Sequence, residues 1–251
     1  MSDFSNTFRL YSKYYDLIYR NKNYNREVNY IDKLLKKFTF GKKNLLEFGS
    51  GTGKHAKFFV KKGYRVHGIE ISSDMISMSH KTNGFTFQKG DIRKIKLKTK
   101  YDIILSLFHV ASYQVRPRDI NELFSNARYH LQPNGIFGFD FWYSAAVNHQ
   151  KPKTKLIEIR KKKFKIIRLA EPKILEKKKI INVNYTMLVK NIFKNTINVI
   201  REKHSMRHFS LSDLKKLCKR HRFKCLHVRE LVSNNKPGKN TWGVFCLLKK
   251  Y

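Results

Sequence analysis

The sequence predicts an α/β fold in which helices cover both faces of a mostly parallel sheet. Short apolar strands alternate with amphipathic helices from residue 43 to residue 141, and the alternation resumes after residue 208. The chain has 251 residues, of which 41% are hydrophobic, so it is long enough for one such domain with an insertion. A glycine-rich turn follows the first predicted strand, at the edge where open α/β sheets bind ligands.

Residues 1–40 predict a helical cap that is rich in aromatic side chains. Tyrosines crowd residues 11–19. Apolar side chains then recur at helical spacing over residues 28–38, until Gly41 ends the helix.

Residues 41–150 and 208–251 predict the α/β domain. Its sheet is expected to contain seven strands, over residues 45–48, 64–69, 85–88, 101–107, 136–141, 224–229 and 241–248. The intervening helices are expected over residues 54–62, 73–80, 119–131 and 210–220. Ser210 and Asp213 form the sequence pattern of a capping box, which predicts where the last helix begins.

Residues 151–207 interrupt this alternation. Residues 155–160 and 164–169 flank a lysine-rich turn, and apolar residues alternate with other residues from Ile181 to Val189. A period of two is typical of antiparallel strands. We therefore expect an inserted antiparallel β-sheet that forms a lid over the substrate region.

The chain is strongly basic, with 54 Lys and Arg against 18 Asp and Glu and a formal net charge of +36. Base-composition drift explains the lysines but not the shortage of acidic residues. Such a charge favours an anionic partner, which could be nucleic acid, a membrane surface or a phosphate-bearing substrate. The basic residues are spread along the whole chain, with short runs at 161–163 and 177–179, which is typical of a solvated surface. The spread therefore counts against nucleic acid.

Other features bear on location and metals. The longest apolar stretch, residues 103–110, is far shorter than the roughly 20 residues that a membrane span requires. Three cysteines and a polar N-terminus predict a cytoplasmic protein with free thiols. Cys218, His221, Cys225 and His227 match no familiar zinc spacing, so we expect no metal. The oligomeric state is open.

The glycine-rich turn predicts a nucleoside site. Its three glycines allow a tight turn and the close approach of a ligand: Gly49, Gly51 and Gly53. Glu70 ends the next strand and can accept hydrogen bonds from both ribose hydroxyls. Lys54 stands where a dinucleotide motif requires glycine, and His55 stands where a P-loop requires Ser or Thr. The expected ligand is therefore a nucleoside without phosphates.

These features resemble motif I of the class I S-adenosylmethionine-dependent methyltransferases. The resemblance continues through Gly90-Asp91-Ile92, the strand at 101–106 and the turn at 131–135, in the family's order. It implies a Rossmann-like sheet and S-adenosyl-L-methionine as the cofactor. It also implies that the cofactor is contacted by Tyr14, Tyr24, Glu47, Gly49, Gly51, Gly53, Glu70, Ile71, Met75, Asp91, Ile92 and Leu107.

The substrate is predicted partly by what is missing. Residues 106–109 lack the Asn/Asp-Pro-Pro-aromatic motif of DNA amino-methyltransferases, and no Pro-Cys nucleophile is present. Residues 14–24, 139–143 and 202–209 resemble methyltransferases of nucleotide-linked amino sugars and polysaccharide precursors. We therefore expect methylation of an amino or hydroxyl group on such a sugar, and the alternative is an RNA- or protein-directed methyltransferase. The residues expected at the substrate are Tyr15, Trp142, Tyr143, Glu202, His204 and Arg207.

The nucleophile must lose a proton, and two residues beyond the fourth strand could accept it. His109 is one candidate; the alternative is a core histidine beneath the cofactor. Tyr113 is the other, at a position where some sugar methyltransferases carry a histidine. Glu202 and His204 share one face of a predicted strand, and Arg207 could bind a phosphate in a bidentate manner. The alternative for these three is a solvated edge of the lid.

Overall fold

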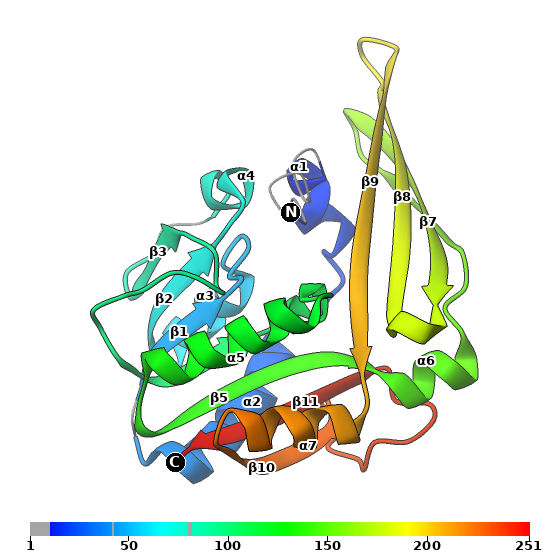
Figure 1. Cartoon of the computed structure of the whole chain (residues 1–251). Coiled ribbons are helices and arrows are strands. Elements are labelled where there is room, and N and C mark those ends of the chain that lie inside the picture. Colours follow the sequence, from blue (N-terminus) through cyan, green and yellow to red (C-terminus); the bar gives the residue numbers. More distant parts are fainter. Residues whose placement is uncertain (1–10, 42, 80–81) are drawn as a thin grey trace.

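The computed structural model describes residues 11–41, 43–79 and 82–251 (Figure 1). Its central strands are β1 (Asn44–Phe48), β2 (Arg65–Glu70), β3 (Phe85–Lys89), β4 (Tyr101–Ser106), β5 (Leu131–Tyr143), β10 (Phe223–Glu230) and β11 (Gly243–Lys250). Strands β1 to β5 pair in parallel in the order β3-β2-β1-β4-β5. Strand β11 pairs antiparallel with β5 and with β10. The predicted α/β class with a mostly parallel sheet is confirmed.

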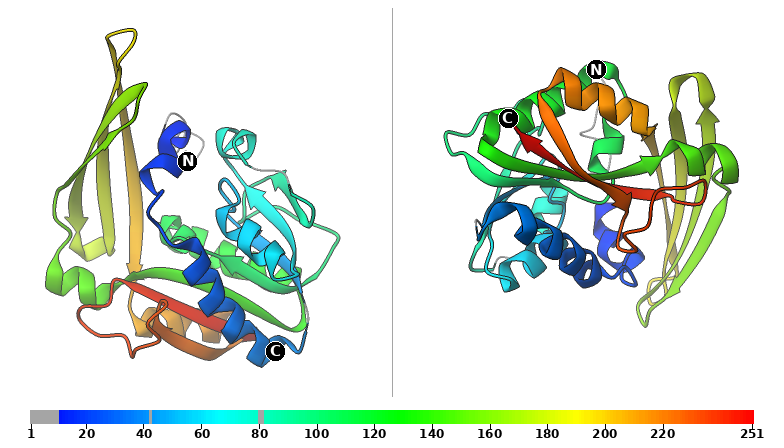
Figure 2. Two further views of the ribbon diagram at one scale, coloured as in Figure 1. Left: turned by 180° about the vertical axis from the view of Figure 1, so that it is seen from behind. Right: turned by 90° about the horizontal axis from the view of Figure 1, so that it is seen from below.

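Helices cover both faces of this sheet (Figures 1 and 2). They are α2 (Tyr24–Thr39), α3 (Lys54–Lys61), α4 (Ser73–Ser77), α5 (Pro117–His130) and α7 (Leu211–Arg220). Two apolar cores result, because each strand alternates its side chains between the faces. One core packs α5 and α7 on Phe137 and Phe139, and the other packs α2 and α3 on Leu45 and Leu105. No helix within the described ranges is long and apolar enough to cross a membrane.

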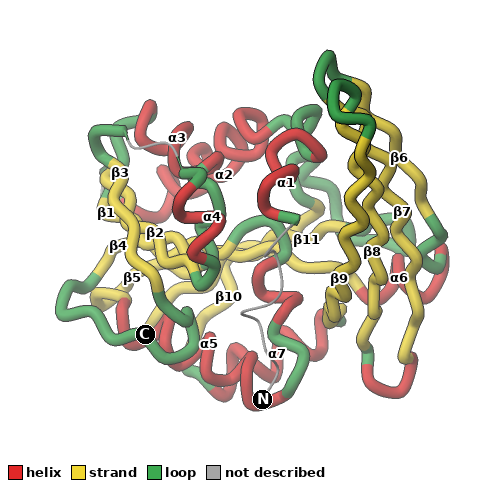
Figure 3. The backbone as a smooth tube through the Cα atoms, turned by 90° about the horizontal axis from the view of Figure 1, so that it is seen from above, coloured by secondary structure: helices red, strands yellow, loops and turns green. Residues whose placement is uncertain are grey.

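The insertion forms a long antiparallel sheet beside α1 (Ser12–Ile18). It consists of β6 (Lys155–Arg160), β7 (Phe164–Leu175), β8 (Ile180–Asn191) and β9 (Thr196–Phe209), with α6 (Ser144–Gln150) and η3 (Glu176–Lys178) at its base. We call these four strands the lid. Viewed from above, α1 lies between the lid and the central strands (Figure 3), and its aromatic side chains pack on the lid.

The lid is hydrogen-bonded to the central sheet, which the sequence did not indicate. Strand β9 continues past residue 207 and pairs with the end of β5 at Trp142↔His208 and Tyr143↔Phe209. All eleven strands of the described chain therefore belong to one network. The predicted count of seven applies only to the central strands β1 to β5, β10 and β11.

Several element ends differ from the sequence-based expectations for local reasons. Helix α5 begins at Pro117 instead of residue 119, because proline is preorganised for the first helical turn. Strand β5 begins at Leu131, so it includes an exposed extension before the buried part that was predicted. The capping box at Ser210 is present, and each partner bonds the backbone N–H of the other.

An ion-pair network fixes the loop after β3 to helix α5. Arg93 donates to Asp91 and also to Asp119, at 2.9 Å. Arg116 adds a bidentate pair to Asp119, whose side chain is fully buried. Burial alone would raise the pKa of Asp119, but the hydrogen bond from Arg116 and the charge of Arg93 outweigh it and lower the pKa. The network keeps Asp91 and Arg93 in place at the edge of the sheet.

We predict that Asp119→Ala lowers the free energy of unfolding at pH 7 by about 2 to 3 kcal/mol, because it removes charge-assisted hydrogen bonds to a buried carboxylate. The matched control on the same helix is Glu122→Ala, whose partner Arg118 is 80% exposed. That change should stay within about 0.5 kcal/mol of wild type. Urea denaturation of both variants measures the difference, and equal losses would contradict the structural role of Asp119.

Candidate active site

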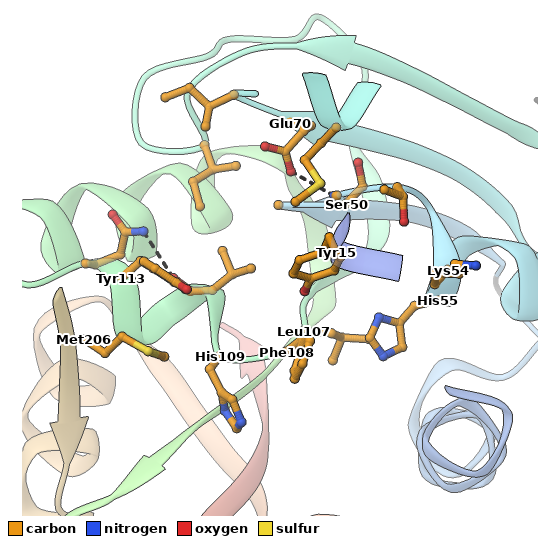
Figure 4. A pocket seen from close by; sticks show the side chains of 18 of the residues that line it. Tyr15, Ser50, Lys54, His55, Glu70, Leu107, Phe108, His109, Tyr113 and Met206 are labelled. Carbon is orange, nitrogen blue, oxygen red and sulfur yellow. Dashed lines mark hydrogen bonds between the residues drawn. The ribbon is translucent and has the colours of Figure 1, made fainter. Parts of the chain in front are cut away.

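A pocket of about 340 Å³ lies at the carboxyl ends of the central strands (Figure 4). Helix α1 supplies Tyr15 to its wall, the strand ends supply Glu70 and His109, and the lid supplies Tyr185 and Met206. The pocket is therefore enclosed by three parts of the chain that are distant in sequence. Its volume is in the range typical of small-molecule sites.

The glycine loop folds as the sequence predicts. Gly49 has a φ of 71°, and a Cβ there would lie 2.7 Å from the side chain of Val110. Gly51 also has a positive φ, and its N–H donates to Oε2 of Glu70 at 2.8 Å. Both positions favour glycine because of their positive φ, and Gly49 also leaves no space for a Cβ.

Glu70 is held at the end of β2 by backbone groups. Its Oε1 accepts from the N–H of Ser72 at 2.9 Å, while Oε2 accepts from Gly51. Burial raises the pKa of Glu70, although these backbone bonds oppose the rise. Each carboxylate oxygen has a second lone pair, and Glu70 lines the pocket. A ligand with two adjacent hydroxyl groups would complement it.

Glu47 lies behind the wall of the pocket. Its side chain is 2% exposed, and its Oε1 lies 3.8 Å from Nδ1 of His55. His55 lines the pocket, and its Nε2 lies 2.8 Å from Oε2 of Glu27. Burial, and then the charge of Glu70, raise the pKa of Glu47 to about 8. Glu47 can therefore influence a ligand only through its neighbours.

His109 is presented to the pocket by a strained turn. Phe108 and His109 follow β4 with φ values of 62° and 64°, which non-glycine residues adopt at a cost. Nδ1 of His109 lies 2.9 Å from the carboxylate of Asp140, and the His109 N–H donates to the same group. Burial would raise the pKa of Asp140, but the adjacent His109 lowers it overall. The two side chains would form an ion pair when the imidazole is protonated.

Tyr113 begins a second buried chain of polar groups. Its hydroxyl lies 2.9 Å from Nδ1 of His204, and Nε2 of His204 lies 3.0 Å from Glu202. The other oxygen of Glu202 accepts from the N–H of Tyr11. Burial raises the pKa of Tyr113 well above its ordinary value, so its hydroxyl keeps its proton near neutral pH.

The structure brings most of the predicted residues together at this pocket. Those that line it are Tyr15, Tyr24, Gly49, Gly51, Glu70, Ile71, Met75, Asp91, Ile92, Leu107, His109, Tyr113 and Trp142. The carboxylate of Asp91 is bound by Arg93 within this wall. Glu202 and His204 lie behind the wall and reach it through Tyr113.

Four other predicted contacts need correction. Tyr14 points to the lid, with its ring 6.1 Å from that of Phe164, because helical spacing turns it away from Tyr15. Gly53 caps α3 and packs on Phe85 outside the pocket. Tyr143 alternates away from Trp142 and packs on the apolar core. The fourth is Arg207, which lies on the opposite face of β9 from Met206.

Arg207 was expected to bind a substrate phosphate. Its guanidinium instead donates twice to the carbonyl of Val115, at 2.7 and 3.0 Å. Along β9 it alternates away from Met206, which lines the pocket. Burial lowers the pKa of Arg207. Its role in this structure is to hold the lid against the loop before α5.

Sequence reasoning missed several lining residues. Tyr19 lies one helical turn after Tyr15, so the spacing could have identified it. Tyr185 belongs to the alternating run that predicted the lid, and its buried neighbours indicated its face. Met206 and Gln114 gave no local signal, because only the pairing of distant segments brings them to the pocket.

Residues 45–135 match a family model described as "Methyltransferase domain". The chain contains a methyltransferase domain. A dTDP-3-amino-3,4,6-trideoxy-alpha-D-glucopyranose N,N-dimethyltransferase of Streptomyces venezuelae is 30% identical over 51% of this chain and 56% of its own length. A dTDP-3-amino-3,6-dideoxy-alpha-D-glucopyranose N,N-dimethyltransferase of Streptomyces fradiae is 23% identical over 51% and 52%. The chain thus spans about half the length of the curated relatives it matches.

Solved structures resemble the chain over nearly its whole length. An S-adenosylmethionine-dependent methyltransferase from Clostridium acetobutylicum has a TM-score of 0.81 at 18% identity, covering 96% of this chain and 98% of that one. A SAM-bound amino pentose methyltransferase from Micromonospora echinaspora has a TM-score of 0.76 at 16% identity, covering 97% and 98%. The fold around the methyltransferase domain, including the lid, is therefore shared with these proteins.

We predict that the ligand-free protein becomes less stable as pH rises from about 4.5 towards 8, in part through Glu47. The folded protein holds a proton on Glu47 that the unfolded chain releases in this window, so rising pH favours unfolding. Glu47→Gln cannot release that proton and should flatten the dependence of the melting temperature on pH. The control, Glu122→Gln, should keep the wild-type slope, and parallel curves for all three proteins would refute the assignment.

Proposed function

We propose that this chain transfers a methyl group from S-adenosylmethionine to the amino group of a nucleotide-linked sugar. The observation that carries the proposal is the single pocket that joins the Glu70 carboxylate to His109 and Tyr113 beneath the lid. The methyltransferase domain and the N,N-dimethyltransferases similar to the chain support both the reaction and the amino group.

The residues of the pocket fit the cofactor. Glu70 would accept hydrogen bonds from the ribose hydroxyls, and the backbone from Gly49 to Gly51 would lie against the rest of the nucleoside. Ile92 and Leu107 offer apolar surface on the same wall. S-adenosylmethionine supplies, when bound, a methyl group on a sulfonium sulfur that a nucleophile can displace in line.

The remaining wall fits a sugar nucleotide better than a polymer. Tyr15 of α1, the following Tyr19, Trp142 and the lid residues line the space next to His109. Lys22 lies over the ring of Phe108 at 4.3 Å. The net charge of +36 attracts an anionic substrate from a distance.

His109 is the residue we assign as the proton acceptor. Its imidazole lines the pocket, and the Asp140 carboxylate would stabilise the imidazolium that forms when it takes a proton. Tyr113 is less suited to this role, because burial keeps its own proton in place. Its hydroxyl can instead orient the amine by hydrogen bonding, with His204 as its partner.

The cofactor assignment predicts a specific loss of binding. Calorimetry should show that S-adenosylhomocysteine binds the wild type, and that Glu70→Ala binds it more weakly by about 1 to 3 kcal/mol, because buried hydroxyl groups lose their acceptor. Glu122→Ala is the control and should bind normally. A wild type that binds neither S-adenosylhomocysteine nor S-adenosylmethionine would overturn the proposed function.

The proton-acceptor assignment predicts a separation of turnover from binding. His109→Asn should lower kcat with a nucleotide-linked amino sugar by about 10²- to 10⁴-fold while the affinity for S-adenosylhomocysteine is kept. Tyr113→Phe keeps the ring and should have a smaller effect on kcat. If His109→Asn lost cofactor affinity to the same extent as turnover, His109 would be a packing residue.

A further inference from the structure

The lid has an outer face that points away from the pocket. Side chains alternate along each strand, so Met187 and Ile200 are buried against α1 and their neighbours face outward. On the outer face, Leu188 is 37% exposed and its cross-strand partner Val199 is 46% exposed. Half-buried Ile167 pairs with Leu188 on the other side, which extends the row across three strands.

This apolar surface continues to the tip of the lid, at the turn between β8 and β9. We define the lid patch as Leu156, Leu188, Ile192, Phe193, Ile197 and Val199. The described chain has ten large hydrophobic side chains that are exposed, and six of them belong to this patch. Single exposed apolar residues scattered over a surface are ordinary, whereas a cluster of them is typical of an interaction surface.

Hydrogen bonds to Asn191 shape the turn at the tip. The Oδ1 of Asn191 accepts from the N–H groups of Phe193 and Lys194, both at 3.0 Å. Asn195 closes the turn with a φ of 47°. Phe193 is 71% exposed at the end of the longest projection of the molecule (Figures 1 and 2).

Cations lie among and around the apolar side chains of the lid patch. Lys165 and Lys190 lie directly opposite each other on neighbouring strands of the outer face, and Arg201 lies two outward-facing rows nearer the base. The neighbouring turn carries the lysine run 161–163, and Lys194 is in the tip. Glu158 is the acidic side chain in this group, and it pairs with Arg160 and Lys165. Directly opposed like charges are unfavourable, and the ion pair with Glu158 offsets part of the repulsion between Lys165 and Lys190.

We propose that the lid patch and its lysines dock on an anionic membrane surface. A single bilayer can bind both features, because its hydrocarbon region accepts apolar side chains and its anionic headgroups attract lysines. A second copy of the chain would bring the same lysines together. Nucleic acid would satisfy the charges, but most of the patch is aliphatic and has no ring on which bases could stack.

Sedimentation with vesicles tests the proposal on the full chain. Binding is expected to vesicles that contain phosphatidylglycerol, little binding to phosphatidylcholine alone, and weaker binding as salt rises. Phe193→Ser should weaken binding about tenfold, because the tip then lacks the apolar side chain that would insert into the bilayer. The matched control is Phe40→Ser, which removes an even more exposed phenylalanine at the end of α2.

A second pair of variants tests the charge. Replacing Lys161, Lys162 and Lys163 together with alanine should weaken binding about tenfold or more. Replacing Lys177 and Lys178, at the base of the lid, should have little effect. Thermal unfolding of each variant confirms that the fold is retained.

Three results would overturn the proposal. One is failure of the wild type to bind anionic vesicles at low salt. Another is equal vesicle binding by Phe193→Ser and wild type, together with RNA binding that is insensitive to Phe193, which would indicate a nucleic-acid surface. The third is a stable dimer in sedimentation velocity that Phe193→Ser dissociates, which would indicate that a second copy covers the patch.

Discussion

A buried chain of hydrogen bonds joins the three segments that enclose the pocket. It runs from Tyr113, after β4, through His204 and Glu202 of the lid to the backbone N–H of Tyr11 before α1. Removing one member would leave its partners buried and unsatisfied, at about 1 to 3 kcal/mol each. The lid, the aromatic helix and the loop that carries His109 therefore hold their positions together. The shape of a pocket built from such distant segments therefore depends on this series of hydrogen bonds.

The carboxyl edge of the sheet gathers acidic groups within a very basic protein. Glu47, Glu70 and Asp140 are all buried there, although the chain has only 18 acidic residues. Glu47 is a nearly isolated acid whose pKa is raised. Backbone N–H groups hold the carboxylate of Glu70, and the carboxylate of Asp140 pairs with His109. The long-range field of the lysines suits an anionic substrate, while Glu70 suits ligand hydroxyl groups and Asp140 suits a proton held by His109. The two charge patterns thus act at different distances.

Much of this architecture could be predicted from local patterns. The strand, glycine loop and Glu70 were predictable because a turn and a strand end are specified by neighbouring residues. Tyr14 and Arg207 were misplaced because their orientation depends on how α1 and the lid pack, and Tyr143 because its face depends on the end of β5. The link from Tyr113 to His204 spans 91 positions, and no local pattern encodes it. The positions of the residues assigned to the cofactor are thus specified by their sequence neighbours. The positions of those that shape the substrate space depend on how distant segments pair.

The central claim is that one pocket brings S-adenosylmethionine and an amino sugar together. Its most direct test is a competition assay in which the protein, methyl-labelled S-adenosylmethionine, a nucleotide-linked amino sugar and RNA share one reaction. Mass spectrometry then locates the label. The account predicts that the label appears on the sugar nitrogen and that RNA stays unlabelled at every salt concentration. Label that accumulates in RNA while the sugar remains unmodified would contradict it.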